Sequence, residues 1–195
     1  MVFIIIKDII SRKVMGKMKK HIIRSYNIIQ KSKKNKELLK KISMYDNTLE
    51  YKTLRERVAI CFYIIQESWM KNEISRARNY MSEKLYNLYS NRINELRTSN
   101  RINIAEDIIL VNTKPIEVNI GEADNNDYIW MYVKGTRKSY QLDAETKSAI
   151  KETLNKGTFK EYWKFIRGSE GWILDETLKL DDISEKVYFE EKLCS

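Results

Sequence analysis

The sequence predicts an α+β fold, because helical and strand periodicities occupy separate stretches of its central part. Apolar residues recur every three or four positions between Thr53 and Leu96, which is typical of helices that bury one face. From Ile102 to Leu174 large side chains alternate instead, and Gly-containing connections join several of the runs. Helices followed by a series of antiparallel strands are the layout of α+β domains.

Three helices are expected in the first of these stretches. The longest runs from about Thr53 to Met70, and a short second helix carries Ile74 and Ala77. Ser82 is a candidate N-cap of the third, because its hydroxyl can accept a hydrogen bond from a free backbone N–H. The expected buried stripes are Leu54, Val58, Cys61, Ile65 and Trp69 with Phe62 beside them, and then Leu85, Leu88, Tyr89, Ile93 and Leu96.

The strands follow after Asn100. We expect a strand at residues 102–111 that continues at residues 115–120 past a bulge or turn, with a bend or a sheet edge at Pro115, which cannot donate a hydrogen bond to a ladder. The next strand is expected at residues 128–133, and residues 137–142 can prolong it past Gly135. Tyr128, Trp130 and Tyr132 share one face of their strand by alternation. The local pattern of residues 143–157 favours a short helix, with an Asp at its start and a Gly after its end.

The last strands form a hairpin from Phe159 to Leu174. A glycine-flanked turn joins two alternating runs, which is a hairpin signal. Alternation places two charged and two aromatic side chains on one face, an unusual mixture for a bare hairpin. The four residues on this face are Glu161, Trp163, Phe165 and Arg167.

This hairpin resembles that of a known family. Its pattern is Phe159-x-Glu161-x-Trp163-x-Phe165-x-Arg167, followed by Gly171-Trp172-x-Leu174. It is similar to the end of the C-terminal domain of the forty-four-kilodalton subunit of the mitochondrial inner-membrane import translocase, and of bacterial relatives. Residues 62–69 and 78–86 are similar to the first helix of that domain and to its next segment. The resemblance covers roughly residues 53–180, and the hairpin is its most specific part.

The resemblance implies a strongly curved antiparallel sheet wrapped around the helices, a cone of the nuclear-transport-factor-like or cystatin-like kind. Such a cone can enclose an apolar pocket, although its aromatic rings can equally fill the core. The resemblance also implies a turn and a variable connector at residues 143–157, so we expect a connector that can contain helical turns. The expected pocket-lining residues are Phe62, Trp69, Tyr128, Trp130, Trp163 and Phe165.

Charge is distributed unevenly along the chain. The net charge is +9, and residues 1–50 contain 13 Lys or Arg against 4 Asp or Glu, whereas the rest of the chain is balanced. A cationic arm of this kind is attracted to polyanions. We therefore expect a basic amphipathic helical arm with a linker at residues 1–50, an α+β domain at residues 51–182 and a tail at residues 183–195.

The arm has the pattern of a basic amphipathic helix between Ile10 and Arg24. Apolar and basic residues recur at the same spacing on separate arcs, and such a helix can lie in the headgroup region of a membrane. The alternative is that its apolar stripe packs on the domain. Residues 31–36 are expected to be a solvated charge run, and residues 37–44 a further short helix. The predicted membrane-binding residues are Phe3, Ile6, Ile10, Lys13, Val14, Lys17, Met18, Lys20, Ile22 and Arg24.

Several chemistries are disfavoured by the residues present. His21 is the single histidine, the two cysteines lack metal-ligand spacing, and no Gly-rich phosphate loop occurs, so no metal or cofactor is expected. Glu161 and Arg167 share a strand face. They are expected to form a structural ion pair, and Glu161 is not expected to act as a general base. Nucleic acid is disfavoured because arginine and aromatic residues are sparse in the arm.

These patterns lead to two hypotheses about function. The first is a non-enzymatic scaffold or adaptor that binds anionic, cardiolipin-like lipid through its arm and recruits an unidentified protein partner, with a role in protein translocation or membrane-protein assembly. The abundance of Ile, Lys and Asn suggests an AT-rich bacterial genome. Together with the basic arm and the resemblance, this gives an expected location that is peripheral, on the cytoplasmic face of a bacterial membrane. The alternative is a binder of a small molecule, lipid tail or peptide, or less favourably an enzyme, using the pocket of the cone.

Overall fold

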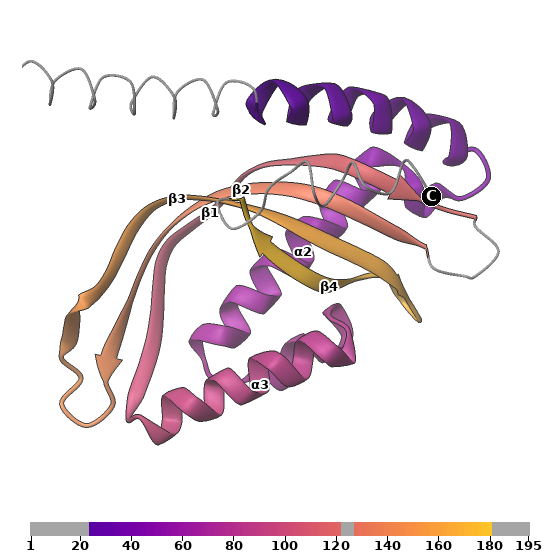
Figure 1. The fold of residues 1–195 in the computed structure, drawn as a ribbon. Helices are drawn as coiled ribbons and strands as arrows, with labels where there is room; N and C mark the ends of the chain where they lie inside the picture. The colour runs from indigo at the N-terminus through magenta and orange to yellow at the C-terminus, as the bar shows by residue number, and fades with distance from the viewer. Residues whose placement is uncertain (1–23, 122–126, 181–195) are drawn as a thin grey trace, which may run out of the picture.

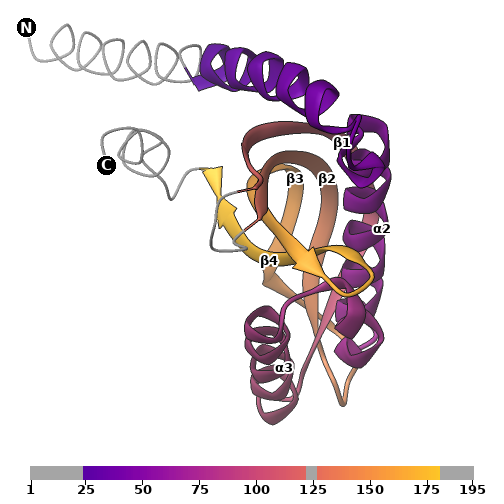
Figure 2. The ribbon, with the colours of Figure 1, turned by 90° about the vertical axis from the view of Figure 1, so that its right-hand side faces the viewer.

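The computed structural model describes residues 24–121 and 127–180 and confirms the predicted α+β fold. Helices come first, and four antiparallel strands follow in the order β1-β2-β3-β4. The sheet is open and strongly curved, and it arches over the helices (Figure 1). In a view turned by 90°, α2 and α3 both lie on the concave side of the sheet (Figure 2).

Helix α2 spans Tyr51–Met70 and packs on the concave face of the sheet. Its buried residues recur at the helical spacing that the sequence predicted, and they include Leu54, Val58 and Ile65. Phe62 is fully buried at the centre of this contact. Its ring centroid lies 5.8 Å from that of Trp163 and 6.0 Å from that of Phe159.

The next two helical segments also follow the prediction. A 3-10 helix, η2, spans Ile74–Tyr80, and α3 spans Glu83–Thr98. Ser82 caps α3, because its Oγ accepts a hydrogen bond from the backbone N–H of Leu85 at 3.2 Å. Leu85 and Ile93 are buried, whereas Leu88 remains 48% exposed.

β1 and β2 follow the prediction, whereas β3 and β4 are longer than the predicted hairpin. β1 spans Arg101–Asn119, β2 Tyr128–Asp143, β3 Ala149–Gly168 and β4 Gly171–Lys179. β1 continues through residues 115–119, as expected, and irregularities in its register include one between Pro115 and Glu117. The expected connector at residues 143–157 was wrong, because a tight turn returns the chain directly into β3. Asp143 Oδ1 accepts hydrogen bonds from the backbone N–H groups of Glu145 and Thr146 in this turn.

The two faces of the sheet pack into different apolar clusters. Ile129, Met131 and Val133 of β2 lie in the main core with α2, together with Trp163 and Phe165 of β3. The alternate residues of the same strands lie in a second cluster. Its buried members are Ile28, Ile116, Trp130, Tyr132, Tyr162 and Leu180.

The N-terminal helix, described over residues 24–42, lies along this second cluster near the end of the sheet (Figures 1 and 2). Ile28 packs in the second cluster, while Leu39 reaches the main core. Asn35 Nδ2 donates a hydrogen bond of 2.7 Å to the carbonyl oxygen of Ile116. One continuous helix therefore replaces the separate charge run and short helix expected at residues 31–44, and its inner face is part of the folded unit.

Replacing Phe62 with Ala should destabilise the fold by about 3–5 kcal/mol, because it removes a fully buried ring and leaves a cavity among three aromatic neighbours. Urea unfolding followed by tryptophan fluorescence measures this loss. Leu154→Ala is the control, since Leu154 is 57% exposed and its truncation should change the free energy of unfolding by less than about 0.5 kcal/mol. Equal effects of the two substitutions would contradict the assigned core.

Candidate functional site

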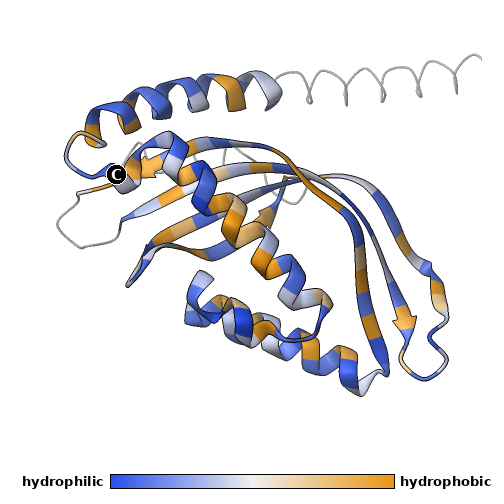
Figure 3. Ribbon diagram, turned by 180° about the vertical axis from the view of Figure 1, so that it is seen from behind, coloured by the Kyte–Doolittle hydropathy of each residue, from blue (hydrophilic) through white to orange (hydrophobic). Residues whose placement is uncertain are grey.

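The predicted membrane-binding residues fall almost entirely outside the described part of the chain. Of the ten, only Arg24 is described, and it lies at the start of the described helix. This helix nevertheless continues the basic character of the arm, with seven Lys or Arg against one Glu in residues 24–42. Hydrophilic residues predominate along it in Figure 3.

The N-terminal helix has a buried side and a lysine-rich side. Ile28, Ser32, Asn35 and Leu39 are buried and recur every three or four residues, as expected for one face of a helix. The rest of the helix is mostly exposed, and it carries Tyr26, Ile29 and Leu38 together with five lysines, which we call the lysine face. The lysine face consists of Lys33, Lys34, Lys36, Lys40 and Lys41.

Two apolar residues follow this helix without cover. Met44 is 82% exposed and Tyr45 is 92% exposed, next to the last lysines of the lysine face. Within residues 24–121 and 127–180, no helix combines the length and the apolar character that crossing a bilayer requires.

The six predicted pocket-lining rings separate into three groups. Phe62 and Phe165 are buried in the main core, and only Trp69 and Trp163 reach a cavity. Tyr128 and Trp130 belong to the second cluster on the opposite face, so their assignment to a pocket was wrong. Alternation groups the residues of a strand into two faces, but it does not say which face the helices cover.

The predicted ion pair between Glu161 and Arg167 is also corrected. Arg167 pairs with Asp46, and its Nε lies 3.2 Å from Asp127 Oδ2. Glu161 Oε2 instead accepts a hydrogen bond of 2.8 Å from the indole Nε1 of Trp163. The two residues share a strand face, but they are six positions apart along β3, which is about 20 Å in an extended strand.

Arg167 therefore joins three segments that are distant in sequence. It contacts Asp46 at the N-cap of η1, a 3-10 helix at Asn47–Leu49, and it donates a hydrogen bond of 3.0 Å to Thr48 Oγ1. It also binds Asp127 before β2, and its guanidinium lies 4.4 Å from the centroid of the Trp172 ring. The family-like hairpin is thus tied to the segment that follows the N-terminal helix.

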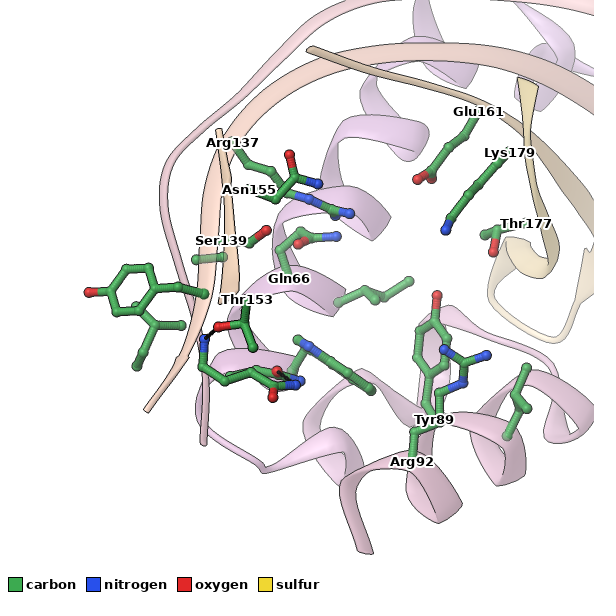
Figure 4. A pocket seen from close by; sticks show the side chains of 18 of the residues that line it. Gln66, Tyr89, Arg92, Arg137, Ser139, Thr153, Asn155, Glu161, Thr177 and Lys179 are labelled. Carbon is green, nitrogen blue, oxygen red and sulfur yellow. Dashed lines mark hydrogen bonds between the residues drawn. The ribbon is translucent and has the colours of Figure 1, made fainter. Parts of the chain in front are cut away.

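The concave side of the sheet holds a pocket of about 640 Å³, bounded by α2, α3 and all four strands. Its lining is mostly polar, in contrast to the apolar pocket that was expected (Figure 4). Arg137 of β2 and Asn155 of β3 extend into it from one wall, and Glu161 and Lys179 approach from another. Arg92 and Tyr89 rise from α3 below.

Burial and nearby charges shift the pKa of the Tyr89 phenol. Burial is the largest cause that raises the pKa of Tyr89, and the nearby carboxylate of Glu161 raises it further. Thr177, Arg92 and Arg137 act in the opposite direction, because they stabilise the phenolate. Tyr89 is therefore a neutral hydroxyl at ordinary pH.

The sequence argument identified Glu161 but missed the basic residues of this pocket. Arg92, Arg137 and Lys179 come from three different elements, and no motif links them. One signal was available for Arg137, because Arg137, Ser139 and Gln141 continue the alternation of Ile129, Met131 and Val133 toward the concave face. Among the described residues, no group of three His, Cys, Asp or Glu is placed to hold a metal ion.

Comparison with known proteins identifies a family. The model of the Tim44-like domain matches residues 35–179, which begins before the domain start expected at residue 51. The intermembrane space region of the chloroplast protein ARC6 has a TM-score of 0.47 at 12% sequence identity, over 66% of this chain and 95% of that chain. An NTF2-like family protein from Streptomyces avermitilis has a TM-score of 0.35 at 10% identity, over 63% of this chain and 92% of that chain. No curated protein matches.

Replacing Asp46 with Asn should lower the free energy of unfolding near neutral pH by about 1 kcal/mol, since the carboxylate is partly exposed. Burial raises the pKa of Asp46, but hydrogen bonds from Thr48 and Arg167 outweigh it and hold the pKa below its usual 3.8. The stabilisation is therefore present above pH 3.8 and is lost as the pH falls through the lowered folded-state pKa.

Urea unfolding at several pH values measures this effect. The difference between wild type and Asp46→Asn should shrink as the medium becomes more acidic than pH 3.8. Glu152→Gln, at an exposed position on β3, serves as the control and should leave the pH profile unchanged. A constant difference across the whole pH range would contradict the role assigned to the carboxylate.

Proposed function

The chain belongs to the Tim44-like domain family, and from this premise we propose that it is a non-enzymatic, membrane-associated scaffold or adaptor. Membership of this family indicates a membrane-associated scaffold or translocation role. The finer proposal is that the protein binds anionic, cardiolipin-like lipid at the cytoplasmic face of a bacterial membrane and recruits a protein partner there.

The observation that carries this proposal is the lysine face. A helix that is anchored through Asn35 and Leu39 cannot rotate freely, so its exposed lysines are held on one side of the folded unit. Each basic residue near an anionic membrane surface adds about 1 kcal/mol of attraction. Several lysines on one face can therefore hold the protein at a membrane without a spanning helix.

Apolar residues supply the second part of the proposed contact. Met44 and Tyr45 are exposed beside the lysine face, and burying such side chains at the interface adds attraction that salt does not screen. The apolar stripe of the arm, with Phe3, Ile6 and Ile10, would extend this contact, as the sequence pattern suggests.

The arrangement of the fold favours an adaptor role. The N-terminal helix lies on the convex side, while α3 lies on the concave side (Figures 1 and 2), where residues of α2, α3 and the sheet line the pocket. A protein bound to the membrane through its lysine face would leave the concave side accessible to a partner. We propose that this partner acts in protein translocation or membrane-protein assembly.

Reversing three charges on the lysine face should weaken binding to anionic vesicles at least about tenfold, because each reversal replaces attraction with repulsion. The variant is Lys34→Glu, Lys40→Glu and Lys41→Glu, at three exposed positions. Co-sedimentation of the full chain with vesicles of cardiolipin and phosphatidylcholine, and with phosphatidylcholine alone, measures this change.

The matched control reverses three exposed lysines at the other end of the sheet, Lys147, Lys151 and Lys156. Both variants change the net charge of the protein by the same amount. A difference in vesicle binding between them therefore depends on where the charges lie and not on the total charge. Equal pelleting of the two variants would refute the lysine face. A duplex DNA competitor that removes all vesicle binding would instead favour a general polyanion site.

A further inference from the structure

We propose that the concave pocket binds a small amphiphilic organic anion, a molecule with a carboxylate or phosphate group on an apolar body. This site is separate from the lysine face and goes beyond the scaffold role proposed above. Three features of the pocket support it, namely its volume, its excess of cations and its combination of polar and apolar lining residues.

The volume suits a small ligand. The pocket measures about 640 Å³, which lies within the range of about 300–1,000 Å³ that is typical of small-molecule sites. Its walls come from the helices on one side and the sheet on the other, so a ligand would contact both layers. The packed rings of Phe62 and Phe165 lie outside its lining, in the core, and leave this space open.

The charges that converge on the pocket favour an anion. Arg92 of α3, Arg137 of β2 and Lys179 of β4 line it, against one carboxylate, that of Glu161. This carboxylate already accepts the indole hydrogen bond of Trp163. The lining therefore carries two more positive than negative charges.

Two of these cations are not held by a salt bridge to a described residue, although Lys179 lies opposite Glu161 in the register of β3 and β4. Among the described residues, neither Arg92 nor Lys179 forms a salt bridge. Arg137 is held in place instead, with its guanidinium 4.9 Å from the centroid of the Phe159 ring. Arg92 and Lys179 are exposed, so water screens much of their mutual repulsion, but both remain available to attract a bound anion. A guanidinium that is already oriented loses little freedom when it binds a carboxylate or phosphate.

Neutral side chains add donors beside the cations. The amides of Gln66 and Asn155 point into the pocket and form no hydrogen bond with other described residues. In the same wall Gln141 is already engaged, because its Nε2 donates to Asn103 Oδ1 at 3.2 Å and its backbone N–H donates to Thr153 Oγ1 at 2.8 Å. Free donors next to a fixed polar network are suited to orient a ligand's head group.

Apolar residues in the lining would contact the body of the ligand. They include Ile65, Trp69, Leu88 and Trp163, from α2, α3 and β3. A simple inorganic ion would leave this surface in water, whereas an amphiphilic anion covers it and gains hydrophobic stabilisation. The pocket thus selects for the combination of an anionic head and an apolar body.

Fluorescence titration with 1-anilinonaphthalene-8-sulfonate, an aromatic anion, tests this site, and N-phenyl-1-naphthylamine is the neutral counterpart. The pocket variant is Arg92→Gln with Arg137→Gln, and the control is Lys147→Gln with Lys151→Gln, which removes the same charge outside the pocket. The pocket variant should bind the anionic probe at least tenfold more weakly than the control does, with the neutral probe unchanged. Equal affinity of the two variants for the anionic probe would overturn the proposal.

Competition identifies the kind of ligand. Displacement of the anionic probe by decanoate indicates a single-chain amphiphile, and displacement by phenyl phosphate indicates a compact organic anion. Failure of both to displace it at millimolar concentration would overturn the site. The variant Lys34→Glu, Lys40→Glu and Lys41→Glu should still bind the anionic probe. Loss of membrane binding and loss of ligand binding in the pocket can therefore be distinguished.

Discussion

Phe62 of α2 lies against Trp163 and Phe159 of β3, and the rest of the structure depends on this contact. It holds a helix of 20 residues on the concave face of a curved sheet. Gly135 of β2 permits the arrangement, because a Cβ at this position would lie 2.4 Å from Cζ of the Phe159 ring and 2.8 Å from the carbonyl oxygen of Ile109. The sheet can then bend around the helices, and its far ends enclose the polar pocket.

The two faces of the sheet have different roles because their side chains have different partners. The concave face packs on α2, and beyond the core its side chains become polar and charged. The convex face receives Ile28 of the N-terminal helix, and Asn35 fixes this helix by a hydrogen bond to Ile116. Arg167 then ties the end of the same segment to the hairpin. The lysine face is thus held rigidly on the side away from the pocket.

Periodicity predicted the helices, the cap at Ser82 and the two-face character of the strands, because local spacing determines these features. It could not predict which face α2 would cover, so Trp130 was placed on the wrong side of β2. The partners of Arg167 were also beyond reach, since Asp46 lies 121 positions away in the sequence. The cations of the pocket were missed for the same reason, because Arg92 and Arg137 meet only after α3 and the sheet have packed.

Spin labelling tests the central claim, that the N-terminal helix presents its lysine face to a membrane. In a Cys194→Ser chain, nitroxide labels are attached at Tyr45→Cys or Lys156→Cys. Cys61 should stay unlabelled, because it is buried and burial raises its thiol pKa to about 12. With cardiolipin-containing vesicles, the label at position 45 should gain oxygen accessibility and lose accessibility to a water-soluble relaxant, while the label at position 156 stays unchanged. Equal changes at both positions, or no change at position 45, would contradict the account.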